Sequence, residues 1–148
     1  MDYVKKVNTV LVSLFNNALK LEEKVLQSTA GNDLSITEIH TLSAVGPGRG
    51  KTMSQVAASL SINVSTLTVA INKLVKKEYV TRFRVPEDGR IVKVQLTDRG
   101  KTVVREHEAF HITMVTEALS RIPEEETEAF LDCIKKMNKY LITRNNQR

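Results

Sequence analysis

The feature of this sequence that most constrains its fold is a change of hydrophobic period past the middle of the chain. Up to about residue 78, apolar residues recur every three or four positions, which is typical of helices. Residues 79–85 and 91–96 instead alternate, and the turn 86–90 between them contains Asp-Gly, so they predict a two-stranded hairpin. The helical period returns after Asp98. The sequence therefore predicts a mainly α chain with one small β hairpin.

Two short helices are predicted immediately before the hairpin. Thr52 can cap the first, and a tight turn at residues 61–63 separates it from the second. The second helix is expected to bury Leu67, Ile71, Leu74 and Val75, and its opposite face is polar and basic without a single acid. Two short helices followed by a basic hairpin are the elements of a winged helix-turn-helix.

The positive charge of the chain is concentrated in the same region. Residues 49–105 carry twelve basic and four acidic side chains, whereas the rest of the chain is weakly acidic and the whole nets +5. A basic centre of this kind indicates a surface for a polyanion. Solvated lysines on ordinary helices are the alternative explanation, and charge alone does not separate the two.

Long amphipathic helices are predicted at both ends of the chain. One covers residues 4–26, a second follows Asp98, and a last one follows Pro123 with an inward stripe from Phe130 to Leu141. A small core cannot cover all of these stripes, so they imply a partner chain, most economically a second copy that allows a two-fold symmetric operator to be bound. We expect a single domain, residues 1–148, with a DNA-binding region at 35–97 and dimerisation helices at 1–30 and 98–148.

The single cysteine and the hydropathy pattern narrow the class of protein further. One cysteine, Cys133, excludes an internal disulfide framework and a multi-cysteine zinc module, and its place in the apolar stripe predicts a buried small hydrophobe. The longest uncharged run, residues 52–72, is too rich in Ser, Thr and Asn to cross a bilayer. We therefore expect a cytoplasmic protein that does not enter membranes.

Two adjacent motifs identify a family resemblance. Pro86-Glu87-Asp88-Gly89-Arg90, followed by Leu96-Thr97-Asp98-Arg99-Gly100, resembles the wing and the Leu-Thr-x-x-Gly signature of the MarR family of winged-helix transcriptional regulators. The resemblance implies that Asp88 braces the wing and that Arg90 enters the minor groove. The family's wing usually has two adjacent basic residues after the aspartate, whereas the first of them here is Gly89.

Shorter matches resemble one subgroup of that family, the repressors of fatty-acid synthesis. They are Met1-Asp2-Tyr3, Leu14-Phe15-Asn16-Asn17, Glu22-Glu23 and Ser35-Ile36-x-Glu38-x-His40-Thr41. This resemblance implies a repressor that acts at fatty-acid-synthesis promoters, with an acylated acyl carrier protein as its corepressor.

The side chains expected to contact DNA fall into three groups. Phosphate contacts supply most of the affinity, and contacts to base edges in the major groove supply specificity. Phosphate contacts near the first short helix are expected from Ser54 and Gln55, and base contacts from Ser65, Thr66, Thr68 and Asn72. The electrostatic set is Lys73, Lys76, Arg82, Arg84, Arg90 and Lys93. The alternative is that the Ser and Thr residues are merely solvent-facing.

The histidines offer two further hypotheses. His107, Glu108 and His111 match the metalloprotease motif H-E-x-x-H, which makes a metal-dependent hydrolase the alternative from another class. That function needs a third ligand and a cleft, and Glu108 is turned about 100° away from His107 on a helix. We therefore expect no enzymatic activity.

The second histidine hypothesis joins Glu22, His40, His107 and His111. By resemblance to zinc-sensing MarR-type repressors, these residues could hold zinc in a tetrahedral N/O site, which would make a zinc-responsive repressor the alternative function. The alternative is that they form a buried hydrogen-bonded latch without metal, and we favour the latch over the metal site.

A helical adaptor that binds other proteins through the end helices is the remaining alternative. The basic block, the hairpin and the acid-free second helix all favour a DNA-binding regulator over it.

Overall fold

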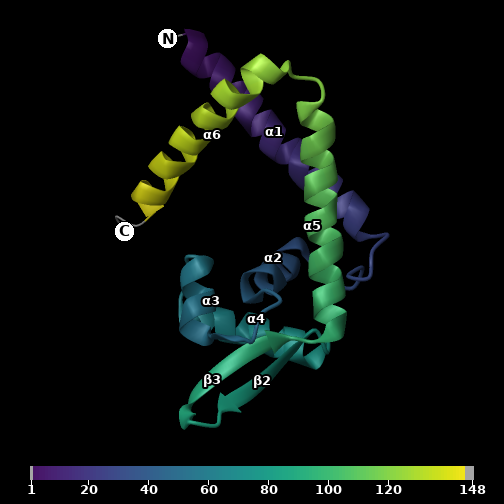
Figure 1. Cartoon of the computed structure of the whole chain (residues 1–148), viewed down its shortest axis with the longest axis vertical. Coiled ribbons are helices and arrows are strands. Elements are labelled where there is room, and N and C mark those ends of the chain that lie inside the picture. The colour runs from purple at the N-terminus through teal and green to yellow at the C-terminus, as the bar shows by residue number, and fades with distance from the viewer. Residues whose placement is uncertain (1, 146–148) are drawn as a thin grey trace. The chain divides into compact units, whose positions relative to one another are not determined.

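The computed structural model describes residues 2–145 and is mainly helical with one small sheet (Figure 1). The elements in chain order are α1 (Asp2–Leu26), α2 (Ile36–Val45), β1 (Lys51–Thr52), α3 (Met53–Ser59), α4 (Val64–Lys76), β2 (Val80–Val85), β3 (Asp88–Leu96), α5 (Asp98–Leu119) and α6 (Glu124–Asn145). The predicted fold class, a mainly α winged helix-turn-helix, is confirmed.

The chain divides into two compact units, residues 1–107 and 108–148, and the division falls within α5. The expectation of one domain stays a prediction. Among the described residues, no single helix has both the length and the apolarity to span a membrane, and α3 and α4 meet that criterion only as a pair, across a bend of 105°.

The first unit has an aliphatic core to which α2, α3, α4, the sheet and the start of α5 all contribute. Its fully buried side chains include Leu42, Val56, Leu67, Ile71 and Leu74. The predicted stripe of α4 is therefore confirmed at Leu67, Ile71 and Leu74, whereas its fourth member, Val75, is half-buried. Tyr79, which follows α4 directly, is also fully buried and places a polar hydroxyl inside this unit.

Side-chain caps define where the short helices begin. Ser35 and Glu38 form a reciprocal capping box at the start of α2, as the sequence pattern predicts. Thr52 caps α3 in the same way with Gln55, and Asn63 caps α4 by accepting a hydrogen bond of 2.7 Å from the Thr66 amide. Each cap satisfies amide groups that the helix itself leaves without a partner.

The sheet differs from the prediction in two ways. It has three strands in the order β1-β3-β2, because Lys51 and Thr52 pair antiparallel with Val94 and Lys93. A strand of two residues is too short to produce an alternating pattern. Gly50, just before it, has φ +91°, and a Cβ atom there would lie 2.9 Å from the Phe83 ring, so the chain can enter this strand only with glycine.

The second difference is the position of the hairpin turn. The turn was predicted at residues 86–90, with Asp-Gly at its centre, but Val85 pairs with Asp88 and β3 begins at Asp88. Pro86 and Glu87 alone make the connection. Proline fixes φ at the value that the second position of a common turn requires, which suits Pro86 to this turn. The register is irregular next to the turn, since Arg84 pairs with Val92 but Val85 pairs with Asp88.

The second unit consists of the later turns of α5 and the helix α6. The predicted inward stripe of α6, Phe130, Cys133, Ile134, Met137 and Leu141, is exposed in the chain, and α6 has no buried residue. The expectation that Cys133 is buried in the chain's own core was therefore wrong. The helix lies where the period predicts it, and in the described part of the chain its apolar face is exposed.

Candidate nucleic-acid interface

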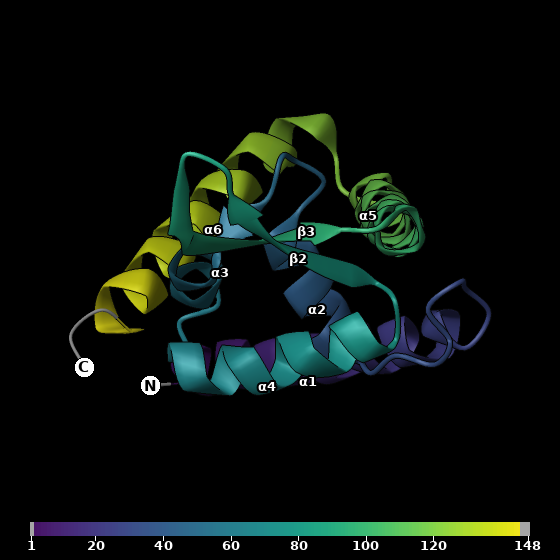
Figure 2. The ribbon, with the colours of Figure 1, turned by 90° about the horizontal axis from the view of Figure 1, so that it is seen from below.

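Helix α4 and the β2–β3 hairpin lie at the same end of the first unit (Figures 1 and 2). The exposed members of the predicted DNA set on α4 are Ser65, Thr66, Asn72, Lys73 and Lys76. None of residues 64–76 is acidic, so this face carries only positive charge. Short hydroxyl and amide side chains beside lysines are suited to base edges flanked by phosphates.

Two residues of the predicted set are also used within the protein. The Thr68 hydroxyl donates a hydrogen bond of 2.8 Å to the carbonyl of Val64, one turn earlier on the helix. The Gln55 side-chain oxygen accepts from the Thr52 amide at 2.9 Å as part of the α3 capping box, so only its amide nitrogen can donate to a phosphate. Ser54, beside Gln55, is exposed.

The tip of the hairpin is held by two short contacts. Asp88 Oδ1 accepts a hydrogen bond of 3.0 Å from the Arg90 amide, which is the kind of contact that the expected bracing role requires. Arg84 reaches across from β2 and donates to the Gly89 carbonyl at 2.9 Å. These bonds order the tip, and the side chains of Arg84 and Arg90 are exposed there.

The remaining wing cations lie on the two paired strands. Arg82 is exposed on β2, opposite Val94 of β3. Lys93 is half-buried on β3 and pairs with Phe83 on one side and with Thr52 on the other. The wing and α4 together therefore bring most of the predicted cations to one end of the unit.

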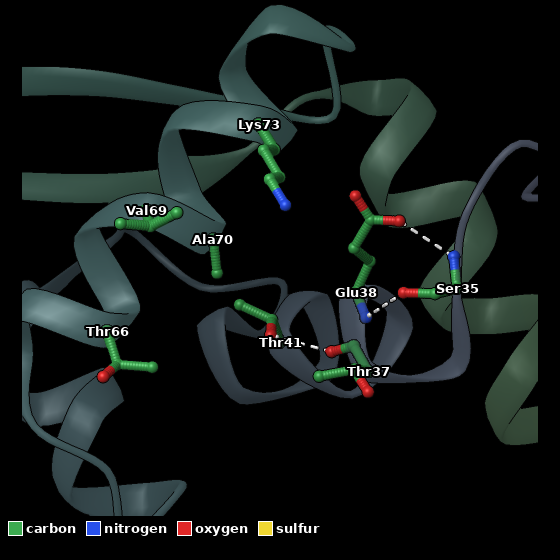
Figure 3. Close-up of a pocket in the computed structure, with 8 residues that line it drawn as sticks. All are labelled: Ser35, Thr37, Glu38, Thr41, Thr66, Val69, Ala70 and Lys73. Atoms are coloured by element: carbon green, nitrogen blue, oxygen red, sulfur yellow. Dashed lines mark hydrogen bonds between the residues drawn. The ribbon is translucent and has the colours of Figure 1, made fainter.

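A hollow of about 580 Å³ lies between α2 and α4 (Figure 3). Its α4 wall is formed by Thr66, Val69, Ala70 and Lys73, and its α2 wall by Ser35, Thr37, Glu38 and Thr41. The hydroxyl of Thr41 is occupied by a hydrogen bond of 2.8 Å to the Thr37 carbonyl. The hollow thus borders the same helix that carries the predicted base contacts.

Three of the four residues predicted to form a metal site or a latch meet in the first unit. Glu22 of α1 is buried, and its Oε1 lies 3.1 Å from Nε2 of His40 on α2 and 2.5 Å from Nε2 of His107 on α5. The two imidazole rings are 5.5 Å apart. The fourth residue, His111, lies one turn further along α5, on the same side of that helix as His107.

The electrostatics of this cluster follow from its contacts. Burial disfavours the charge of Glu22, but the hydrogen bonds from His107 and His40, together with the electrostatic attraction of both imidazoles, hold the pKa of Glu22 below its ordinary value. One carboxylate and two imidazoles are also a donor set that Zn²⁺ accepts. Glu108, which the hydrolase hypothesis needs as a base, is exposed in the second unit.

Sequence reasoning missed a set of contacts at the C-terminal end of α4. Lys77 donates to Glu38 and to the Asp33 carbonyl, Tyr79 donates its hydroxyl to Asp33, and Arg99 lies 4.2 Å above the Tyr79 ring. The only sequence signals were the Ser35–Glu38 capping pattern and the Leu-Thr-x-x-Gly signature, and neither indicates which distant residues would meet.

Comparison with known proteins decides the family. Residues 25–107, more than half of the chain, match the family model described as transcriptional regulator SarA/Rot. The chain belongs to the SarA/Rot family of transcriptional regulators. This membership confirms the prediction of a regulator rather than an enzyme, and the hydrolase alternative is dropped.

Individual transcriptional regulators that are similar to this chain agree with the assignment. The chain is 30% identical to the HTH-type transcriptional regulator YpoP of Bacillus subtilis over 67% of either chain. It is 33% identical to Streptococcus pneumoniae FabT, solved in complex with DNA, with a TM-score of 0.90 over 95% of this chain and 98% of that one. A MarR family protein from Bacillus stearothermophilus shares the fold, with a TM-score of 0.79 at 16% identity over 95% of this chain and 96% of that one. The winged-helix resemblance seen in the sequence is thereby confirmed.

Proposed function

We propose that this SarA/Rot-family regulator binds double-stranded DNA as a homodimer and represses genes of fatty-acid synthesis. The observation that carries the DNA-binding proposal is the acid-free face of α4, which shares one end of the unit with the cationic hairpin. In this arrangement α4 enters the major groove, and Arg90 at the ordered hairpin tip reaches the adjacent minor groove. The likeness to FabT in its DNA complex supports the proposal.

The exposed apolar faces of the terminal helices support the homodimer. Large side chains on α1 and α6, such as Leu14, Phe15, Ile134 and Leu141, are 45% to 58% exposed in the chain. Apolar stripes of this extent are stable in water only when another surface covers them. A second copy provides that surface and sets two α4 helices at a fixed spacing, which an inverted-repeat operator matches.

The fatty-acid subgroup adds a corepressor to this proposal. The short matches around residues 14–17 and 35–41 and the 33% identity to FabT support the subgroup. We propose that an acylated acyl carrier protein binds the dimer and increases the affinity of the dimer for DNA. In the same proposal, Glu22, His40 and His107 act as a hydrogen-bonded latch between α1, α2 and α5. Similarity to known proteins does not support the zinc-responsive alternative.

The DNA-binding proposal is tested by three alanine variants titrated against operator DNA and against a scrambled duplex of equal length. Arg90→Ala should weaken binding to both duplexes, because phosphate and minor-groove contacts carry little sequence information. Thr66→Ala and Asn72→Ala should weaken operator binding by about tenfold each and leave binding to the scrambled duplex unchanged, because a base contact contributes about 1–3 kcal/mol of discrimination. Unchanged operator binding in all three variants would overturn the assignment.

The corepressor and the latch are tested with the wild-type protein. Tighter binding to a fatty-acid-synthesis promoter in the presence of acylated carrier protein, with no metal found by elemental analysis, is the expected result. Equal affinity for DNA with acylated and with unacylated carrier protein would show that the acylated form is not the corepressor. Near-stoichiometric zinc together with zinc-dependent DNA binding would show that these residues form a metal site and not a latch.

A further inference from the structure

The three lysines in and directly after the last turn of α4 have different environments. Lys73 is exposed at the rim of the hollow between α2 and α4 (Figure 3). Lys76 is exposed on the polar face of α4. The Lys77 side chain is only one-third exposed, and its Nζ atom makes three bonds inside the protein. It donates to the Asp33 carbonyl at 2.7 Å and to both carboxylate oxygens of Glu38 at 3.0 Å. These contacts use the donor capacity of its ammonium group, so Lys77 has no proton left for a phosphate.

The partner of Lys77 is itself fixed in place. Glu38 Oε2 also accepts the Ser35 amide at 2.8 Å, which makes Glu38 part of the capping box that begins α2. Burial disfavours the charge of Glu38, but the hydrogen bonds from Ser35 and Lys77 and the Lys77 charge outweigh burial and hold its pKa below the ordinary 4.5. Lys77 therefore ties the last turn of α4 to an ordered ion rather than to a mobile surface group.

On its other side, the end of α4 is held by the start of α5. Three consecutive carbonyls, those of Lys77, Glu78 and Tyr79, accept hydrogen bonds from Arg99 Nη1 at 2.9 Å, the Thr97 hydroxyl at 2.8 Å and the Thr97 amide at 3.0 Å. Gly100 allows this approach, because a Cβ atom there would lie 2.2 Å from the Tyr79 carbonyl oxygen. We call residues 77–79 and 97–100 together the α4–α5 joint.

We propose that Lys77 is a positioning residue for DNA recognition, which fixes the orientation of α4 through Glu38 without touching DNA. The inference rests on the proposed DNA-binding function and deepens it. The backbone contacts of the α4–α5 joint hold the end of α4 as a pivot, and the Lys77–Glu38 pair sets the angle of the helix relative to α2. That angle determines where Thr66, Asn72 and Lys76 meet the operator.

The test compares two lysines that are adjacent in the sequence. In Lys77→Met the aliphatic stem is kept and the ion pair is lost, and we expect operator affinity to fall by about tenfold, a typical effect of changing a residue in a coupling network. The dependence of log affinity on log salt should keep the wild-type slope, because no phosphate contact is lost. In Lys76→Met the slope should fall by about one phosphate contact.

A second pair of variants separates positioning from simple loss of stability. Glu38→Gln keeps an oxygen that can accept from Ser35 but removes the charge that holds Lys77. All titrations are made well below the unfolding temperature of each variant. We expect Glu38→Gln to reproduce the loss seen in Lys77→Met, and the double variant to be no weaker than either single one, as residues acting through one contact require.

The outcomes distinguish this inference from the proposed function. If wild-type protein binds operator DNA and Lys77→Met binds equally well, the positioning role is wrong and DNA binding stands. A salt slope reduced in Lys77→Met as in Lys76→Met would make Lys77 a direct phosphate contact and would also overturn the inference. If wild-type protein prefers no duplex, the proposed function itself fails.

Discussion

The DNA-binding region and the terminal helices solve the problem of burying apolar surface in different ways. Residues 34–104 contain every buried apolar side chain of the core, including Leu42, Leu67 and Leu74. In contrast, α1 buries only Glu22 and α6 buries nothing, although both carry long rows of large apolar residues. The comparison teaches that the central region is held by its own contacts, whereas the terminal helices leave rows of large apolar side chains exposed, which the proposed dimer would cover.

The largest effect is expected where the central region is most tightly packed. In Gly100→Ala the new methyl group would meet the Tyr79 carbonyl, a backbone atom that cannot move without separating α5 from β2. We expect a loss of about 3 kcal/mol in the free energy of unfolding, at the upper end for overpacking, measured by urea denaturation. Gly48→Ala is the control, because a Cβ atom there meets nothing within 4 Å. Equal stability of both variants would show that the joint is loosely packed.

The next effect tests the terminal helices. Ile134→Asp and Leu141→Asp place a charge on the exposed apolar face of α6, and we expect each to halve the molecular mass seen by analytical ultracentrifugation. Operator affinity should then fall by about a hundredfold or more, because two linked sites gain at least that from avidity. Thr143→Asp adds the same charge on the opposite side of α6 and should do neither. A monomeric wild-type protein would contradict the comparison directly.

A smaller effect tests the buried hydroxyl of the central region. Burial, the hydrogen bond to Asp33 and the charge of that carboxylate raise the pKa of Tyr79 to about 12. The neutral phenol is thus favoured by folding, so its contribution to stability is complete below pH 10 and is lost as the pH rises through 12. Unfolding midpoints measured from pH 9 to 12 should fall in wild-type protein more steeply than in Tyr79→Phe. Parallel curves would contradict this environment for Tyr79.

The smallest effect concerns the backbone at the end of α4. Glu78 has φ +64°, a left-handed conformation that is unfavourable for a residue with a Cβ atom, at the position where helices usually end in glycine. Glu78→Gly should therefore raise the free energy of unfolding by about 0.5 kcal/mol, after the added flexibility of the unfolded chain is subtracted. Lys77→Gly, one residue earlier and at φ −82°, should lower it. Calorimetry of the two variants side by side is the measurement.

The sequence predicts the elements of this chain well because period and caps are local signals. The stripe of α4, the capping box of α2 and the alternating strands of the hairpin are all in place. The short strand β1 was missed because two residues carry no periodic signal, and the turn lies at Pro86 and Glu87 instead of being centred on Asp-Gly. The stripe of α6 was assigned correctly to one face, but a pattern cannot say which molecule covers that face.

The candidate site is predictable only to the extent that its residues lie on one element. The polar face of α4 follows from helical spacing, and the meeting of Glu22, His40 and His107 came from a family resemblance. The contacts around the end of α4 could not be foreseen, because Lys77, Glu38, Asp33 and Arg99 come from four separate segments. Their contacts depend on how the central region packs, which no local pattern encodes.

The most direct test of the account is a selection of bound duplexes from a random DNA library, followed by measurement of the stoichiometry on the enriched sequence. We predict an inverted repeat whose half-sites lie about one helical turn apart, bound by two copies of the chain. An enriched single half-site bound by one copy, or no enriched sequence at all, would contradict the account.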